Sequence, residues 1–142
     1  MSATLLLDTH IALWLDSGSD RLRTATRFLI DECWRGGGRI LLSAVSAWEI
    51  ALLADLKRID LDIASEAWIE RFLARPGVEA VALSHRAAAR AYEVRGFEQR
   101  DPADRLLVAT AIELGCPLVT YDTHIAKFAK RHGRRDGFAV AA

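Results

Sequence analysis

Residues 101–122 read DPADRLLVATAIELGCPLVTYD and contain the succession of elements that decides the fold. Asp101 is a good N-cap and Pro102 is favoured at the first helical position, so a helix is predicted to begin here. Gly115 ends this helix, because glycine tolerates the left-handed conformation that a helix exit requires. A short apolar strand follows at once and stops at Asp122. Such a helix leading directly into an apolar strand is typical of proteins with a parallel sheet.

The same alternation of helices and short apolar strands extends over the rest of the chain. Runs of apolar residues, rather than alternating apolar and polar ones, predict strands that are buried on both faces. The predicted strands cover residues 4–7, 39–42, 78–83 and 118–121, with 138–140 as a last edge strand. The predicted helices cover 11–15, 22–35, a segment from Ser43 or Ser46 to about 56, 63–73, 84–94, 101–114 and 123–130, and 96–100 form a loop. The pattern predicts an α/β fold with helices on both faces of the sheet.

The bulk composition predicts one domain over residues 1–142. The chain has 142 residues, and 51% of them are hydrophobic, which is enough to fill one core. It has 19 Lys and Arg against 19 Asp and Glu, whereas a nucleic-acid binder that relies on its overall charge is usually basic. Any contact with nucleic acid must therefore come from bound cations or from a local patch. The basic residues at 130–135 are one such patch, or simply an exposed C-terminal turn.

The cysteines and the hydropathy indicate a cytoplasmic protein. Cys33 and Cys116 lie far apart and outside any CxxC pattern, which argues against a disulfide framework or a zinc site. We expect both to be small buried hydrophobic residues. The apolar run at the N-terminus is too short for a signal peptide, and no stretch approaches the ~18 apolar residues of a membrane span.

Two aspartates follow predicted strands directly. Asp8 ends the first strand and Asp122 ends the fourth. In open parallel sheets, binding sites form at the carboxyl ends of strands, so neighbouring strands would point both carboxylates into one crevice. Aspartate is also common at turns and helix N-caps, and Asp122 can equally cap the helix that follows it.

Two further carboxylates lie in or at predicted helices. Asp104 falls in the first turn of the helix that Asp101 opens, where the helix dipole favours any carboxylate by roughly 0.3–1 kcal/mol. Both can therefore be ordinary helix-start residues, although two acids exceed what capping requires. Glu49 lies in the middle of the helix SAVSAWEIALLADL, among apolar neighbours. A carboxylate there is exposed, paired or metal-bound, because burying an unpaired charge is costly.

Together these residues suggest a metal site built from carboxylates. No His and Cys set has the spacing of a transition-metal site, and hard oxygen ligands favour Mg²⁺ or Mn²⁺. Clustered carboxylates raise one another's pKa, so they do not remain fully ionised without a cation. A metal held this way can activate water and stabilise a phosphoryl transition state. The sequence therefore predicts metal-dependent phosphodiester chemistry.

Four motifs give the sequence a family resemblance. In order along the chain they are LLLDTH, SAVSAWEIALL, DPADRLLVATAIELG and LVTYDTHI, from residue 5 to 125. In this order and spacing they resemble the motifs of PIN-domain nucleases, in particular VapC-type toxins of bacterial toxin–antitoxin pairs. The resemblance implies a three-layer α/β/α fold whose five-stranded parallel sheet has the order 3-2-1-4-5.

The resemblance also implies the roles of particular residues. It identifies Asp8, Glu49, Asp104 and Asp122 as the catalytic acids that hold Mg²⁺ or Mn²⁺. The accessory residues that it suggests are Asp101, Thr9, Ser46 and Thr120. The implied reaction is endonucleolytic hydrolysis of RNA to a 5′-phosphate and a 3′-hydroxyl. The implied partners are a cognate antitoxin protein, an RNA substrate and a second copy of the chain or a toxin–antitoxin hetero-oligomer, with no membrane.

Other readings of the same residues remain open. His10 can contact RNA or water at the site, or can be a plain helix-start residue. Most of Trp14, Trp34, Trp48 and Trp68 are expected in the core, and the resemblance suggests that others line an exposed groove for an antitoxin peptide or a homodimer contact. A PIN-domain nuclease of RNA processing, without an antitoxin, would share every motif, and a non-catalytic binding module is a further class. A receiver-type phosphoacceptor domain is disfavoured, because it needs adjacent acids after the first strand.

Overall fold

Parallel strands form the centre of the computed structural model, which describes residues 3–98 and 101–142. Within that part of the chain there are five strands, all parallel, in the order β3-β2-β1-β4-β5. They are β1 (Thr4–Leu7), β2 (Arg39–Ser43), β3 (Val78–Val81), β4 (Leu118–Val119) and β5 (Val140–Ala141). The predicted fold class and the strand order implied by the family resemblance are both confirmed.

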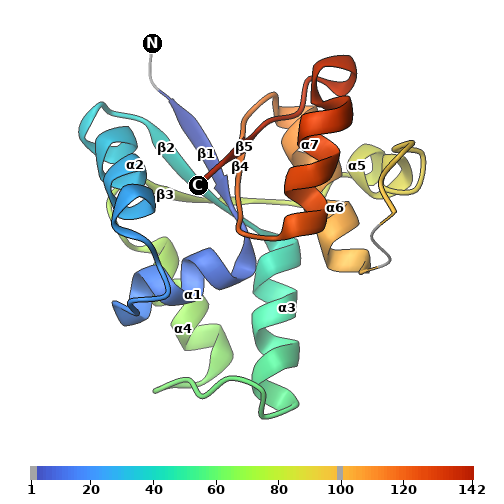
Figure 1. The fold of residues 1–142 in the computed structure, drawn as a ribbon. Helices are drawn as coiled ribbons and strands as arrows, with labels where there is room; N and C mark the ends of the chain where they lie inside the picture. Colours follow the sequence, from blue (N-terminus) through green and yellow to red (C-terminus); the bar gives the residue numbers. More distant parts are fainter. Residues whose placement is uncertain (1–2, 99–100) are drawn as a thin grey trace.

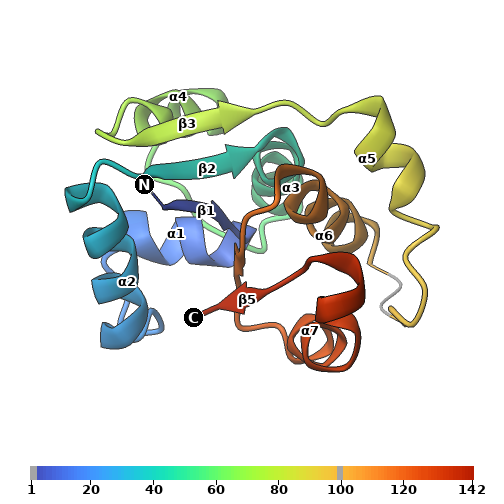
Figure 2. The same cartoon turned by 90° about the horizontal axis from the view of Figure 1, so that it is seen from above.

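Helices cover both faces of this sheet (Figures 1 and 2). The helices are α1 (Thr9–Ser17), α2 (Thr24–Arg35), α3 (Ala44–Asp55), α4 (Ser65–Leu73), α5 (His85–Arg90), α6 (Pro102–Leu114) and α7 (Thr123–Asp136). Strand β1 shows the division of the core, because its alternate residues belong to different clusters. Leu5 and Leu7 pack with α1, α2 and α4, whereas Leu6 packs with α6 and α7. A strand buried on both faces explains why the sequence shows a continuous apolar run.

Several element boundaries differ from the sequence prediction, for local reasons. Helix α5 ends at Arg90 instead of about residue 94, and turns follow it. Helix α7 continues past residue 130 to Asp136 and ends at Gly137, which has a positive φ of 67°. The basic segment at 130–135 thus belongs to the end of a helix, where positive side chains are favoured by the helix dipole. The loop predicted over 96–100 lies partly outside the described residues, because 99 and 100 are not described.

The cysteines and tryptophans test the expected core. Cys33 and Cys116 are free and buried, as predicted. The expectation that most of the tryptophans lie in the core is wrong. Trp68 is buried, but Trp34 and Trp48 are 44% and 56% exposed. An indole covers a wide area, so these helix faces remain available to other molecules. None of the described helices is long and apolar enough to cross a membrane.

Candidate functional site

Every carboxylate that the sequence singled out lines one pocket. It lies at the carboxyl end of the sheet, where β1 runs into α1 and where α3, α6 and α7 begin (Figure 1). The pocket has a volume of about 400 Å³. Its lining residues are Asp8, His10, Ile11, Trp14, Arg21, Glu49, Asp101, Asp104, Tyr121 and Asp122. The topology thus joins acids that are more than 110 positions apart in the sequence, because β1 and β4 are neighbouring strands.

The Asp8 carboxylate is held by contacts from the start of α1 and from the end of the neighbouring strand β4. It follows β1 in an extended conformation and is the N-cap of α1. Its Oδ1 accepts a hydrogen bond from the Thr9 backbone N–H at 2.7 Å. Its Oδ2 accepts one from the Thr120 hydroxyl, which comes from the end of β4, at 2.6 Å. The carboxylate is therefore fixed in orientation and is only 9% exposed.

Thr120 connects two of the acids. Besides donating to Asp8, its hydroxyl accepts from the backbone N–H of Asp122 at 3.1 Å. Asp122 Oδ1 accepts from the N–H of Ile125 at 2.9 Å, so this residue does cap α7. The cap occupies one carboxylate oxygen, and Asp122 nevertheless lines the pocket. Capping and a role in the pocket are therefore compatible for this residue.

The two acids at the start of α6 have separate positions. Asp101 is the N-cap, and its Oδ1 accepts from the Ala103 N–H at 2.9 Å. Asp104 lies in the first turn and is 9% exposed. Within the described residues no hydrogen bond to the Asp104 carboxylate is seen, and its oxygens are not among the buried atoms that lack a partner, so the carboxylate opens onto the pocket. Asp104 is thus placed for something other than capping.

Glu49 is half-buried on α3 and lines the pocket. The start of α3 is fixed by Ser43, whose hydroxyl accepts from the Val45 N–H at 3.0 Å. Ser46, one turn before Glu49, accepts from the Thr9 hydroxyl at 3.0 Å, and both side chains are fully buried. Thr9 and Ser46 therefore join α1 to α3 beneath the pocket and do not line it.

The electrostatics of the pocket favour a bound cation. Burial, and then the charges of Asp8, Asp101, Asp122 and Glu49, raise the pKa of Asp104 to about 8. Burial also raises the pKa of Asp8 against the hydrogen bonds from Thr120 and Thr9. Burial, followed by the charges of Asp8 and Asp101, raises the pKa of Glu49. A divalent cation would relieve this repulsion, and an all-oxygen donor set suits Mg²⁺ or Mn²⁺.

The carboxylates are not already arranged as a closed coordination shell. In residues 3–98 and 101–142, no three His, Cys, Asp or Glu side chains lie close enough to hold one ion as they stand. Mg²⁺ usually keeps several of its waters and binds proteins through one or two carboxylates. An open, carboxylate-lined pocket of this kind fits such an ion, with water completing its ligands.

Replacing Thr120 by valine tests how the pocket is supported. Valine has the same shape but cannot donate to Asp8 or accept from Asp122. Removing a hydrogen bond to a side chain that binds a metal typically costs about 10- to 100-fold in metal affinity, so we expect the affinity of the pocket for Mn²⁺ to fall at least about 10-fold. Calorimetric titration would measure the fall, with Thr110→Val as a matched control, since the Thr110 hydroxyl donates to the Leu106 carbonyl. An unchanged Mn²⁺ affinity of Thr120→Val would show that Asp8 needs no such support.

The sequence reasoning missed part of the pocket wall. Trp14, Arg21 and Tyr121 line the pocket, and so does His10, for which the sequence allows either a contact at the site or a plain helix-start position. One signal for the wall was available: His10 and Trp14 are four residues apart, so they share one face of α1, and Asp8 caps the same helix. Arg21 lies in the loop after α1, where no periodicity indicates the direction of a side chain.

Comparisons with known proteins identify the family of this chain. The family model described as PIN domain matches residues 5–131. Ribonuclease VapC22 of Mycobacterium tuberculosis is 35% identical over 131 residues, which are 92% of this chain and 95% of that protein. Among solved structures, VapBC2 from Rickettsia felis, bound to a DNA fragment from its promoter, has a TM-score of 0.66 at 14% identity and covers 97% of both chains. FitAcB from Neisseria gonorrhoeae has a TM-score of 0.63 at 18% identity and covers 97% of this chain and 96% of that one. The chain belongs to the PIN-domain family.

Proposed function

We propose that this protein is a Mg²⁺-dependent endoribonuclease and acts in the cytoplasm as the toxin of a toxin–antitoxin pair. The observation that carries the proposal is the pocket in which Asp8, Glu49, Asp104 and Asp122 meet and in which three of these four acids have raised pKa values. The name of the relative, ribonuclease VapC22, supports RNA as the substrate. A toxin–antitoxin complex from Klebsiella pneumoniae, whose fold is similar with a TM-score of 0.59 at 18% identity, supports the biological role.

The residues would divide the reaction between them. Asp8, Asp104 and Asp122 hold one or two Mg²⁺ ions, directly or through water, with Asp101 as an accessory acid. Bound Mg²⁺ offsets the negative charge of the phosphate and of the transition state. Glu49 orients the attacking water and accepts its proton, for which its raised pKa is suited. The water oxygen bonds to phosphorus, the bond from phosphorus to O3′ breaks, and O3′ takes a proton. The products are a 5′-phosphate and a 3′-hydroxyl.

Purified protein and a complex RNA sample test the activity. We expect cleavage in Mg²⁺ or Mn²⁺, none in excess chelator, and recovery when the metal is restored. Sequencing of the RNA ends would identify the cut sites and the 5′-phosphate. Metal-independent cleavage, or no cleavage of any RNA, would contradict the proposal.

An exposed apolar stripe on α3 supports assembly with a partner. Trp48, Leu52 and Leu56 are 56%, 38% and 50% exposed and recur every four residues, so they lie on one face of the helix. Contiguous exposed apolar surface often marks an interaction site. Native mass spectrometry of the chain, co-expressed with the small reading frame next to its gene, would show the assembly. A monomer without a co-purifying small protein would favour a PIN-domain nuclease that acts in RNA processing.

A further inference from the structure

Three rings stand in a row along one wall of the acidic pocket. His10, Trp14 and Tyr121 all line it. The centroids of the His10 and Trp14 rings are 5.7 Å apart, and those of Trp14 and Tyr121 are 5.9 Å apart. Phosphodiester hydrolysis at the carboxylates does not itself require aromatic groups. Nucleobases, in contrast, stack on aromatic side chains whatever their sequence.

Tyr121, at one end of this row, is held in place by Arg23 and Thr26. The guanidinium of Arg23 lies over the Tyr121 ring, 4.2 Å from its centroid. The Tyr121 hydroxyl accepts from the Arg23 N–H at 2.9 Å and is hydrogen-bonded to the Thr26 hydroxyl. Tyr121 and Trp14 are both half-buried, and His10 is exposed. Because Arg23 covers one face of Tyr121 and the hydroxyl of Tyr121 is hydrogen-bonded within the protein, Trp14 and His10 are the rings that a base can reach.

The pocket continues into a second hollow that shares this wall. His10, Trp14 and Arg21 line both the acidic pocket and a groove of about 630 Å³ between α1, the segment at 58–62 and α4. A polymer that reaches the carboxylates therefore has a continuous path past the rings.

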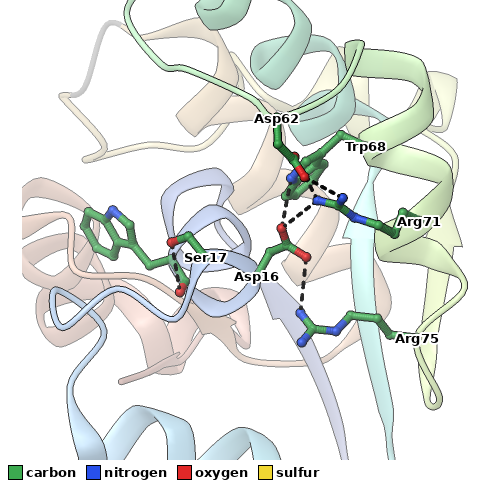
Figure 3. Close-up of polar contacts among 7 residues, drawn as sticks. Asp16, Ser17, Asp62, Trp68, Arg71 and Arg75 are labelled. Carbon is green, nitrogen blue, oxygen red and sulfur yellow. Dashed lines mark hydrogen bonds and ion pairs between the residues drawn. The ribbon is translucent and has the colours of Figure 1, made fainter.

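Ion pairs fix the far wall of this groove (Figure 3). Asp16 Oδ2 accepts from Trp68 Nε1 at 3.0 Å and from Arg71 Nη2 at 3.2 Å. Arg71 also donates to both carboxylate oxygens of Asp62, at 2.8 and 3.1 Å. These contacts join α1, the 58–62 segment and α4. They also neutralise Arg71, which leaves little of its charge for a phosphate.

Arg21 is the arginine that both hollows share, and its charge is not used inside the protein. It is exposed, and within the described residues it makes no ion pair. The loop that carries it is fixed, because Arg27 Nη2 donates to the Ser19 carbonyl at 2.8 Å and the Arg21 N–H donates to Ser19 Oγ at 3.2 Å. A positive side chain at the rim of an acidic pocket can bind the phosphate that the carboxylates would repel.

We infer that Trp14, with His10, is a stacking platform for a nucleobase of single-stranded RNA, and that Arg21 binds an adjacent phosphate of the same strand. The inference rests on the proposed ribonuclease function and specifies how the substrate reaches that site. A base that is paired and stacked within a duplex cannot also stack on a side chain, so the platform selects unpaired nucleotides. The neutral overall charge agrees with binding by stacking and one local arginine.

Binding measured without cleavage tests the platform. In an Asp8→Asn background, fluorescence anisotropy would follow a labelled single-stranded RNA oligonucleotide of random sequence. Stacking is worth about 1–3 kcal/mol per base, so we expect Trp14→Leu to raise Kd about 10-fold, while Trp14→Phe keeps it within about 3-fold. Arg21→Ala should raise Kd about 5-fold and flatten its salt dependence by roughly one phosphate contact. Arg86→Ala, an exposed arginine on α5 that lines neither hollow, is the matched control.

A cross-link would show the contact directly. The same RNA carrying 5-iodouridine should cross-link, on irradiation, to Trp14 or His10, as mapped by mass spectrometry. Cross-links confined to other segments, or a Kd that Trp14→Leu leaves unchanged, would overturn the inference while wild-type cleavage leaves the ribonuclease function standing. If Trp14→Leu weakens only the binding of the antitoxin protein, the platform belongs to that partner and the inference is likewise wrong. If the wild-type protein cuts no RNA, the proposed ribonuclease function is wrong. The binding and cross-linking results are then judged separately from the cleavage result.

Discussion

Asp8→Asn is expected to lower metal-dependent RNA cleavage by about 10³-fold, because metal-ion catalysis supplies several kcal/mol of transition-state stabilisation. Asparagine keeps the oxygen that accepts from the Thr9 N–H at the start of α1. It loses the negative charge that attracts the cation. The loss should therefore appear in activity and metal affinity, and steady-state rates on a defined RNA at saturating Mg²⁺ would measure it.

The fold of this variant should remain intact. Its circular dichroism spectrum should match that of the wild type, and its melting temperature without metal should be equal or higher, because one of the clustered charges has gone. Asp31→Asn, at an exposed position on α2, is the matched control and should leave cleavage unchanged. Cleavage by folded Asp8→Asn within about 10-fold of the wild type would exclude Asp8 from the metal-binding chemistry.

Asp104→Asn is expected to change how the stability of the metal-free protein depends on pH. The pKa of Asp104 is raised from 3.8 to about 8 by burial and by the surrounding acids. Between those values the folded protein holds a proton that the unfolded chain releases, so the stability contributed by this group falls as pH rises from about 4 to about 8. Asparagine cannot ionise, and the variant should escape this loss.

Melting curves across that pH range measure the effect. We expect the two proteins to melt alike near pH 4 and the variant to melt about 3 °C higher near pH 8, after solvent screening at the mouth of the pocket is allowed for. Mn²⁺ should stabilise the wild type most at the high end of the range, because protons compete with it at the low end. A constant difference in melting temperature at all pH values would show that Asp104 does not titrate as proposed.

The sequence indicated which acids meet in one pocket, because their positions follow simple rules of topology. Asp8 and Asp122 follow strands, and the carboxyl ends of neighbouring parallel strands meet at one edge. Glu49 was identifiable because a carboxylate among apolar residues on a helix must be exposed, paired or metal-bound. The helix start was equally clear, with Asp101 as the predicted N-cap and Asp104 in the first turn. The hydrogen bond to Ala103 shows that Asp101 is the cap.

Features that depend on several segments at once were beyond the sequence. One such feature is the row of rings that joins α1 to the end of β4, formed by His10, Trp14 and Tyr121. No residue spacing within either segment predicts it. The Asp16 ion pairs join α1 to α4 across more than 50 positions of sequence. Fewer tryptophans than expected lie in the core, because hydrophobicity alone does not distinguish a buried ring from an exposed one.

Calorimetric titration of Mn²⁺ into the purified chain tests the central claim that these carboxylates form a divalent-metal site. The account predicts saturable binding to the wild type, binding to Asp31→Asn that matches it, and no measurable binding to the double variant Asp8→Asn, Asp104→Asn. Absence of Mn²⁺ binding by the wild type would contradict the account and favour a non-catalytic binding module. Equal binding by the double variant would place the metal elsewhere and contradict it as well.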